Sequence, residues 1–191
     1  YNIAPTQDVP AVRAGQEGAR AFAMLHWGLV PKWAKERAIG NRMINARAET
    51  LAEKPSFRDA YRKRRCLVLA DGWYEWQVTP DGKQPWFIHM KDARPIAFAG
   101  LWERWKDPAD GALLESCTIV TTDASESIRK IHERMPVVLA EADWGRCLRK
   151  GKRRLPLMHY TGRCNQTSQL RLRQMMTSPT SATCTVAPPD V

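Results

Sequence analysis

The residue with the clearest chemical potential is Glu75, in the segment Trp73-Tyr74-Glu75-Trp76. Side chains alternate along a strand, so Glu75 is predicted to share a face with Trp73 and Gln77. Tyr74 and Trp76 then point to the other face. A carboxyl group among indole rings is poorly solvated when ionised, so its pKa should rise, and it can act as acid and base near neutral pH. The alternative is an edge-strand glutamate that points to water.

His132 is a second candidate for proton transfer. It follows a helix that Ser125 is expected to cap, and that helix is predicted to end near residue 132. A helix C-terminus favours the imidazolium form, so this side chain could titrate near neutral pH. The alternative is a histidine that only satisfies terminal carbonyl groups.

Asn45 and Arg47 are two residues apart and are predicted to lie on one face of a short extended segment. A carboxamide can orient a substrate and a guanidinium binds phosphate, so this pair suits a nucleotide site. The alternative is a loop asparagine beside a surface ion pair between Arg47 and Glu49. Trp33, in a polar loop, could stack on a nucleobase.

The chain has five cysteines and no Cys-x-x-Cys spacing: Cys66, Cys117, Cys147, Cys164 and Cys184. Cys66 and Cys117 lie in apolar runs, which indicates reduced, buried thiols rather than disulfides or a zinc site. A thiol protease built on Cys66 and His132 is therefore disfavoured. The sequence also lacks a Gly-rich phosphate loop, a Gly-x-Ser-x-Gly segment and a His-Glu-x-x-His segment, which weakens the case for NTPases, serine hydrolases and zinc peptidases. We expect no metal and no cofactor.

Charge is distributed unevenly along the chain. The formal net charge of +10 is concentrated in residues 146–191, while residues 1–145 are nearly balanced. We therefore expect one domain over 1–145, followed by a basic tail rich in Ser, Thr and Pro over 146–191. No apolar run is long enough to suggest a membrane segment.

The elements that must position these residues are mostly short strands. The patterns predict strands at 21–30, 66–70, 73–78, 86–90, 96–105, 117–122 and 136–139, and helices at 56–64, 125–132 and 141–148. A Ser-x-x-Asp sequence at 56–59 is expected to cap the first helix. Short strands without regular intervening helices indicate a strand-rich, mixed α/β fold with curled, barrel-like sheets.

Eight segments, taken in order, resemble the SOS response-associated peptidase (SRAP) family. They are Tyr-Asn-Ile-Ala-Pro-Thr (1–6), Trp-Gly-Leu-Val-Pro (27–31), Asn-Ala-Arg-Ala-Glu-Thr (45–50), Ala-Asp-Gly-Trp-Tyr-Glu-Trp (70–76), Gln-Pro-Trp-Phe (84–87), Phe-Ala-Gly-Leu-Trp (98–102), Thr-Ile-Val-Thr-Thr (118–122) and Ile-His-Glu-Arg-Met-Pro (131–136). Each segment is weak alone, but eight in order are specific.

The resemblance implies a protein that binds abasic sites in single-stranded DNA, including at junctions with duplex, and crosslinks to them. In the family, a cysteine after the initiator Met provides an amine that forms a Schiff base with the sugar aldehyde and a thiol that closes a thiazolidine. The resemblance gives catalytic roles to Asn45, Glu75 and His132.

For DNA binding, the resemblance implies six residues: Asn2, Pro5, Trp33, Arg47, Thr121 and Arg134. Trp33 matches an aromatic wedge at the DNA junction, and Arg47 and Arg134 match residues that hold phosphate. We expect a monomer that acts in the cytoplasm at the nucleoid, in the response to DNA damage.

The printed sequence departs from the family at its start, because its first cysteine is Cys66. We therefore expect a chain truncated at the N-terminus that does not crosslink as printed. Two alternatives are a non-covalent module for damaged single-stranded DNA, or an inactive fragment. A further one is a thiol peptidase limited to removing its own initiator Met.

Overall fold

The computed structural model describes residues 2–15, 19–149 and 169–175 of the chain. Its elements are β1 (Asp8–Ala14), β2 (Arg20–Trp27), η2 (Arg37–Arg42), β3 (Asn45–Arg47), η3 (Ala48–Thr50), α1 (Arg58–Lys63), β4 (Arg65–Ala70), β5 (Gly72–Thr79), β6 (Gly82–Met90), β7 (Ile96–Lys106), β8 (Leu113–Asp123), α2 (Glu126–Arg129), β9 (Arg134–Pro136), α3 (Glu141–Leu148) and β10 (Leu170–Gln174).

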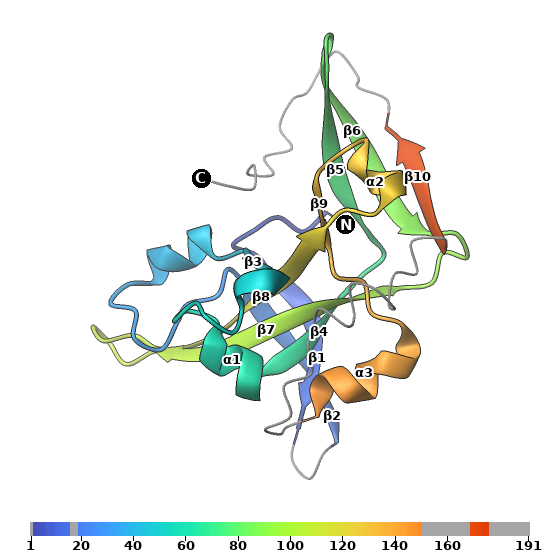
Figure 1. Ribbon diagram of the computed structural model, residues 1–191. Coiled ribbons are helices and arrows are strands. Elements are labelled where there is room, and N and C mark those ends of the chain that lie inside the picture. Colours follow the sequence, from blue (N-terminus) through green and yellow to red (C-terminus); the bar gives the residue numbers. More distant parts are fainter. Residues whose placement is uncertain (1, 16–18, 150–168, 176–191) are drawn as a thin grey trace.

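Strands β2, β1, β4, β7 and β8 form a closed barrel (Figure 1). Neighbours along this order are antiparallel, and the barrel closes where β2 runs parallel to β8. The closing contact is short and pairs His26 with Ser116 and Trp27 with Cys117. This arrangement confirms the predicted strand-rich, barrel-like fold.

The central barrel strands are buried on both faces, which explains their nearly continuous apolar sequences. Val68 and Phe98 belong to one hydrophobic cluster, whereas Leu67 and Ala99, one residue away in each strand, belong to another. The second cluster includes Cys147 of α3, and α1 and α3 both contact β4. Helices therefore cover one face of these strands, and the other face is buried inside the barrel.

The second sheet consists of β10, β6 and β5. The hairpin β5–β6 is inserted between β4 and β7 and projects from the barrel, as Figure 1 shows. At its base the indole of Trp73 packs edge-on against Phe98 of β7, with ring centroids 5.6 Å apart. Glu75 is thus carried by an extension of the barrel, not by the barrel itself.

The structure differs from the sequence-based expectations in three strands. The patterns did not indicate β1, because Pro10 and Arg13 interrupt its apolar alternation, but it pairs with both β2 and β4. They also did not indicate β10, which comes from the segment expected to be tail and pairs with β6. The strand expected at 136–139 is displaced and lies at Arg134–Pro136.

Two helix ends also differ from expectation. The first helix begins at Arg58 after Phe57, without a side-chain cap, so Ser56 does not form the expected capping box. The second helix ends at Arg129, and His132 therefore lies in the segment that leads into β9. Within the described residues, no helix is both long and apolar enough to span a membrane.

Candidate active site

Glu75 lies on β5, the edge strand of the second sheet, opposite Trp86 of β6. Burial raises the pKa of its carboxyl to about 7, against opposing effects of the His132 charge and, more weakly, the Trp73 indole. The Trp73 N–H is buried, and it favours the ionised carboxyl by polar interaction although it makes no hydrogen bond of ordinary geometry. The predicted rise in pKa is therefore confirmed, and it arises from desolvation.

Gln77 connects the strand of Glu75 to the segment that carries His132. Its amide Nε2 donates a hydrogen bond of 2.9 Å to the carbonyl oxygen of Lys130. Its Oε1 accepts one of 3.1 Å from the indole Nε1 of Trp86, which fixes which way the amide points. The predicted shared face of Glu75 and Gln77 therefore points to residues 130–132.

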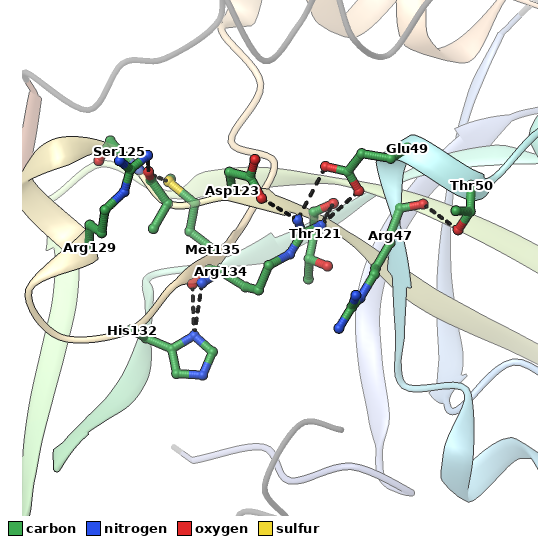
Figure 2. A network of polar contacts seen from close by, with 11 residues as sticks. Arg47, Glu49, Thr50, Thr121, Asp123, Ser125, Arg129, His132, Arg134 and Met135 are labelled. Carbon is green, nitrogen blue, oxygen red and sulfur yellow. Dashed lines mark hydrogen bonds and ion pairs between the residues drawn. The ribbon is translucent and has the colours of Figure 1, made fainter. Parts of the chain in front are cut away.

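The ring of His132 is held by the backbone of Arg134. Its Nδ1 lies 3.1 Å from the Arg134 N–H and 3.1 Å from the Arg134 carbonyl oxygen (Figure 2). The neutral ring can accept from the N–H, and the charged ring can donate to the carbonyl. Either way Nε2 is left for another partner, so the ring keeps one orientation in both charge states.

Asn45 and Arg47 lie on β3, which runs parallel to β8. Ala46 between them is buried in the core, so both polar side chains point to the opposite face, as predicted. Arg47 is in register with Thr121. In Figure 2 the Arg47 guanidinium and the His132 ring extend to the same side of the layer formed by β3 and β8.

Arg134 of β9 is the centre of a polar network that joins η3, β8 and β9 (Figure 2). Its guanidinium contacts Glu49 at 2.9 Å and Asp123 at 2.6 Å, and it donates to the Thr121 carbonyl oxygen at 3.0 Å. Burial alone would lower the pKa of Arg134, but these two carboxylates raise it. Glu49 thus pairs with Arg134, and phosphate binding by Arg134 stays a prediction.

Trp33 is presented by a well-anchored loop. Its side chain is 58% exposed. The indole Nε1 of Trp105 donates to the Ala34 carbonyl oxygen at 2.8 Å, and Ser116 Oγ accepts from the Val30 N–H at 2.9 Å. A rigidly held, exposed indole is suited to stacking on a flat ligand.

The N-terminal segment folds back on β2. The Thr6 N–H donates to the Trp27 carbonyl oxygen at 2.8 Å, and Ile3 packs against the core. Asn2 is exposed and Pro5 is half-buried. Thr6 adopts a positive φ of 74°, an unusual conformation for a β-branched residue that these contacts stabilise.

The structure thus brings the predicted residues together in two groups. Glu75 and His132 interact electrostatically, while Arg47, Thr121 and Arg134 share the layer around β8. In the part of the chain that the structure describes, Asn45 forms no hydrogen bond with Glu75 or His132.

Three residues were missed as parts of the site: Gln77, Glu49 and Asp123. Only Gln77 had a sequence signal, since alternation along the strand places it beside Glu75. Glu49 and Asp123 gain their roles from pairing with Arg134, and strand pairing at long range is not visible in the spacing.

The described cysteines are poor nucleophiles. Cys66, Cys117 and Cys147 are buried and unpaired by disulfides. Burial raises the pKa of Cys66 well above its usual range and raises the pKa of Cys117 and of Cys147 to about 12. Cys164 and Cys184 lie outside the described residues. Within the described ranges, no cluster of three or more His, Cys, Asp or Glu side chains could hold a metal ion.

Comparison with known proteins gives consistent relationships. The abasic site processing protein YoqW of Bacillus subtilis is 46% identical over 148 residues, which cover 75% of this chain and 65% of YoqW. The abasic site processing protein HMCES of Gallus gallus is 33% identical over 168 residues, covering 73% of this chain and 50% of HMCES. A crystal structure of a Bacteroides thetaiotaomicron protein superposes with a TM-score of 0.80 at 27% identity, covering 93% of this chain and 80% of that one.

The chain therefore spans about two thirds or less of the length of these curated relatives. Residues 1–178 match the family described as SOS response associated peptidase (SRAP). The same resemblance was inferred from eight short segments, and the match extends it beyond residue 145. The chain belongs to the SRAP family.

Proposed function

We propose that this protein processes abasic sites in single-stranded DNA, and that the complete protein becomes covalently attached to them. The observation that carries the proposal is the proximity of Glu75, whose pKa is about 7, to His132. The names of the relatives YoqW and HMCES support the same substrate. The proposal assigns Glu75 and His132 to proton transfer on an abasic sugar.

In the proposed reaction an amine attacks C1′ of the ring-opened sugar aldehyde and gives a carbinolamine. Loss of water then forms a Schiff base, and this step needs a proton delivered to the departing hydroxyl. A carboxyl group with a pKa near 7 can deliver that proton and recover one from the attacking amine, whose own pKa is near 8. His132 assists opening of the sugar ring.

The covalent product requires a cysteine directly after an initiator Met. Its α-amine forms the Schiff base, and its thiol then adds to the imine carbon while the thiol proton passes to nitrogen, which closes a thiazolidine. The three described cysteines do not fit this role, because each is buried with a raised pKa. The attacking groups belong to an N-terminal cysteine that the printed sequence does not contain.

The remaining site residues would bind the DNA. We propose that Asn45 orients the sugar or the amine, and that Arg47 binds a phosphate, since both lie on the open face of β3. Trp33 would stack at the junction between single-stranded and duplex DNA, consistent with its exposure. Asn2, Pro5, Thr121 and Arg134 would line the same site.

The test is a crosslinking assay on a denaturing gel. A form of the protein that begins with Met-Cys is incubated with an abasic oligonucleotide, and a heat-stable shifted band is expected. Glu75→Gln should slow band formation by about 100-fold and leave DNA affinity within about twofold, since one general acid–base group is removed. Glu53→Gln, an exposed glutamate outside the site, is the matched control. Unchanged crosslinking in Glu75→Gln would refute the role of Glu75.

A second candidate is a module that binds damaged single-stranded DNA without reacting. Burial of all three described cysteines favours it, because none offers an accessible thiol. A shift on native gels without any band on denaturing gels would support this candidate over the crosslinker.

A thiol peptidase is the third possibility that the family description raises. Replacing Cys66 or Cys117 should leave any self-removal of the initiator Met unchanged, because their thiols are buried. We further propose a monomer acting at the nucleoid in the cytoplasm, where DNA substrates lie.

A further inference from the structure

The outer face of the second sheet carries aromatic and basic side chains that the proposed reaction does not use. Strand alternation and register place Tyr74 of β5, Phe87 and His89 of β6, and Arg171 and Arg173 of β10 on one face. We call these five residues the outer ring face. Glu75 lies on the opposite, inner face of the same sheet.

The two faces differ in how they are packed. Side chains of the inner face, including Trp73, Ile88 and Leu172, belong to or pack against the hydrophobic core. The rings of the outer ring face are half-buried and contact one another instead: the centroids of Tyr74 and Phe87 are 5.1 Å apart, and those of Phe87 and His89 are 5.2 Å apart. The Phe87 and His89 planes are tilted by only 19°, so the two rings stack.

Gly72 allows the Phe87 ring to lie against the backbone of β5. A Cβ atom at position 72 would approach the Phe87 ring to 2.7 Å, closer than carbon atoms normally come. The Phe87 ring therefore lies across the neighbouring strand β5 at Gly72.

Two arginines extend the rows of rings across the sheet. Arg173 is in register with Phe87, which is itself opposite Tyr74, and Arg171 is in register with His89. Both arginine side chains are exposed. Each row across the sheet thus ends in a positive charge, with strands about 4.8 Å apart.

We propose that the outer ring face binds single-stranded DNA that continues beyond the abasic site. Flat rings stack on bases without regard to sequence, and guanidinium groups neutralise phosphates, the combination found in single-strand binding platforms. A peptide or acidic protein would match the charge but not the row of stacked rings. This inference rests on the proposed function, in which DNA is the substrate, but the outer ring face is separate from the reacting groups.

Continuity with the active site supports this assignment. Among the described residues β5 is an edge strand, so none of the described strands continues the sheet beyond it. Glu75 and Tyr74 are neighbours on β5 and point to opposite faces. A strand of DNA engaged at Glu75 therefore needs only to pass over the edge of β5 to reach Tyr74.

The test measures affinity for undamaged oligo(dT) of about 5 and about 20 nucleotides by fluorescence anisotropy, over a series of salt concentrations. The double variant Arg171→Gln/Arg173→Gln should lower the salt slope of log K for the longer oligonucleotide by about 1.4, because each lost phosphate contact removes about 0.7. Phe87→Leu should weaken binding of the longer oligonucleotide by about fivefold or more, through lost stacking. Affinity for the shorter oligonucleotide should not change.

The matched control is Arg20→Gln/Lys106→Gln, which removes two exposed charges from the ends of barrel strands. If the two double variants lower the slope equally, or if neither does, the outer ring face does not bind DNA. Failure of the proposed reaction has a different signature, since abasic crosslinking would be lost while the length-dependent affinity of the unmodified protein persists.

Discussion

At the scale of single residues, surroundings decide what Glu75 can do. Its flanking tryptophans predicted a raised pKa, and burial in the folded chain does raise it to about 7. The local segment did not indicate its charged neighbour, because His132 lies far along the sequence and only the fold brings them together. The residue type and local segment therefore indicated the chemistry, and the family resemblance indicated the pair.

The raised pKa of Glu75 has a consequence for stability. The folded state holds the proton up to pH about 7, whereas the unfolded chain releases it near 4.5, so stability falls as pH rises between these values. Glu75→Gln removes this effect and should raise the free energy of unfolding at pH 8 by up to about 3 kcal/mol. Urea unfolding at pH 8 and pH 4 measures it.

At pH 4 the gain should disappear, because Glu75 is then protonated in both states. Glu53→Gln should show no such pH dependence, since Glu53 is exposed. An equal effect of Glu75→Gln at both pH values would mean that its pKa is not raised.

Another residue-scale prediction concerns the ion pair between Arg64 and Glu103. Glu103 is only 4% exposed. Glu103→Gln leaves the guanidinium without its charge partner and should lower the free energy of unfolding by about 3 kcal/mol. Glu115→Gln, in a more exposed pair with Arg13, should cost about 1 kcal/mol or less. Equal losses in urea unfolding would contradict the burial argument.

At the scale of elements, Gln77 connects β5 to the segment before β9, and we expect this connection to keep water away from Glu75. Gln77→Leu keeps a similar volume but removes the hydrogen bonds to Lys130 and Trp86. Water should then reach Glu75, and its pKa should fall by about one unit or more toward 4.5. NMR titration of the Glu75 carboxyl measures this shift.

The control for that variant is Gln84→Leu. Gln84 also lies in the second sheet, and its amide donates to the carbonyl oxygens of Pro85 and Met175, away from Glu75. Its substitution should leave the Glu75 pKa unchanged. A pKa that moves equally in both variants would show a general loosening of the sheet, and not a specific role of Gln77.

Elements were predictable where their pattern is local. The shared face of Asn45 and Arg47 was predicted correctly, because alternation depends only on adjacent residues. The strand β10 was not, since its alternating arginines resemble a solvated tail until β6 offers a partner. The expected end of the Ser125 helix was also wrong, because the pairing of β9 with β8 is a tertiary effect that the local pattern does not show.

At the scale of the whole molecule, the barrel depends on close packing across its interior. A Cβ atom at Gly100 would lie 2.8 Å from Cys66 Sγ and 3.0 Å from Val68 Cγ2. Gly100→Ala should therefore lower the free energy of unfolding by about 1–3 kcal/mol through overpacking. Thermal or urea unfolding measures the loss.

Gly145 offers the opposite case. It lies within α3, and a Cβ atom there would meet nothing within 4 Å. Gly145→Ala should raise stability by about 0.5–1 kcal/mol, because alanine favours the helix. If Gly100→Ala did not lower the free energy of unfolding, the barrel interior would have space for a methyl group that the contacts do not indicate.

The acid and the imidazole come from opposite sides of a seam, at which Trp73 of the hairpin meets Phe98 of the barrel. Gentle warming should part such a seam before it disrupts a ring of strands closed on itself. Brief heating should then abolish the proposed reaction while the circular dichroism spectrum remains native, and cooling should restore the reaction. We therefore expect the hairpin contact to limit the temperature range of the proposed reaction, and the barrel to determine the temperature of global unfolding.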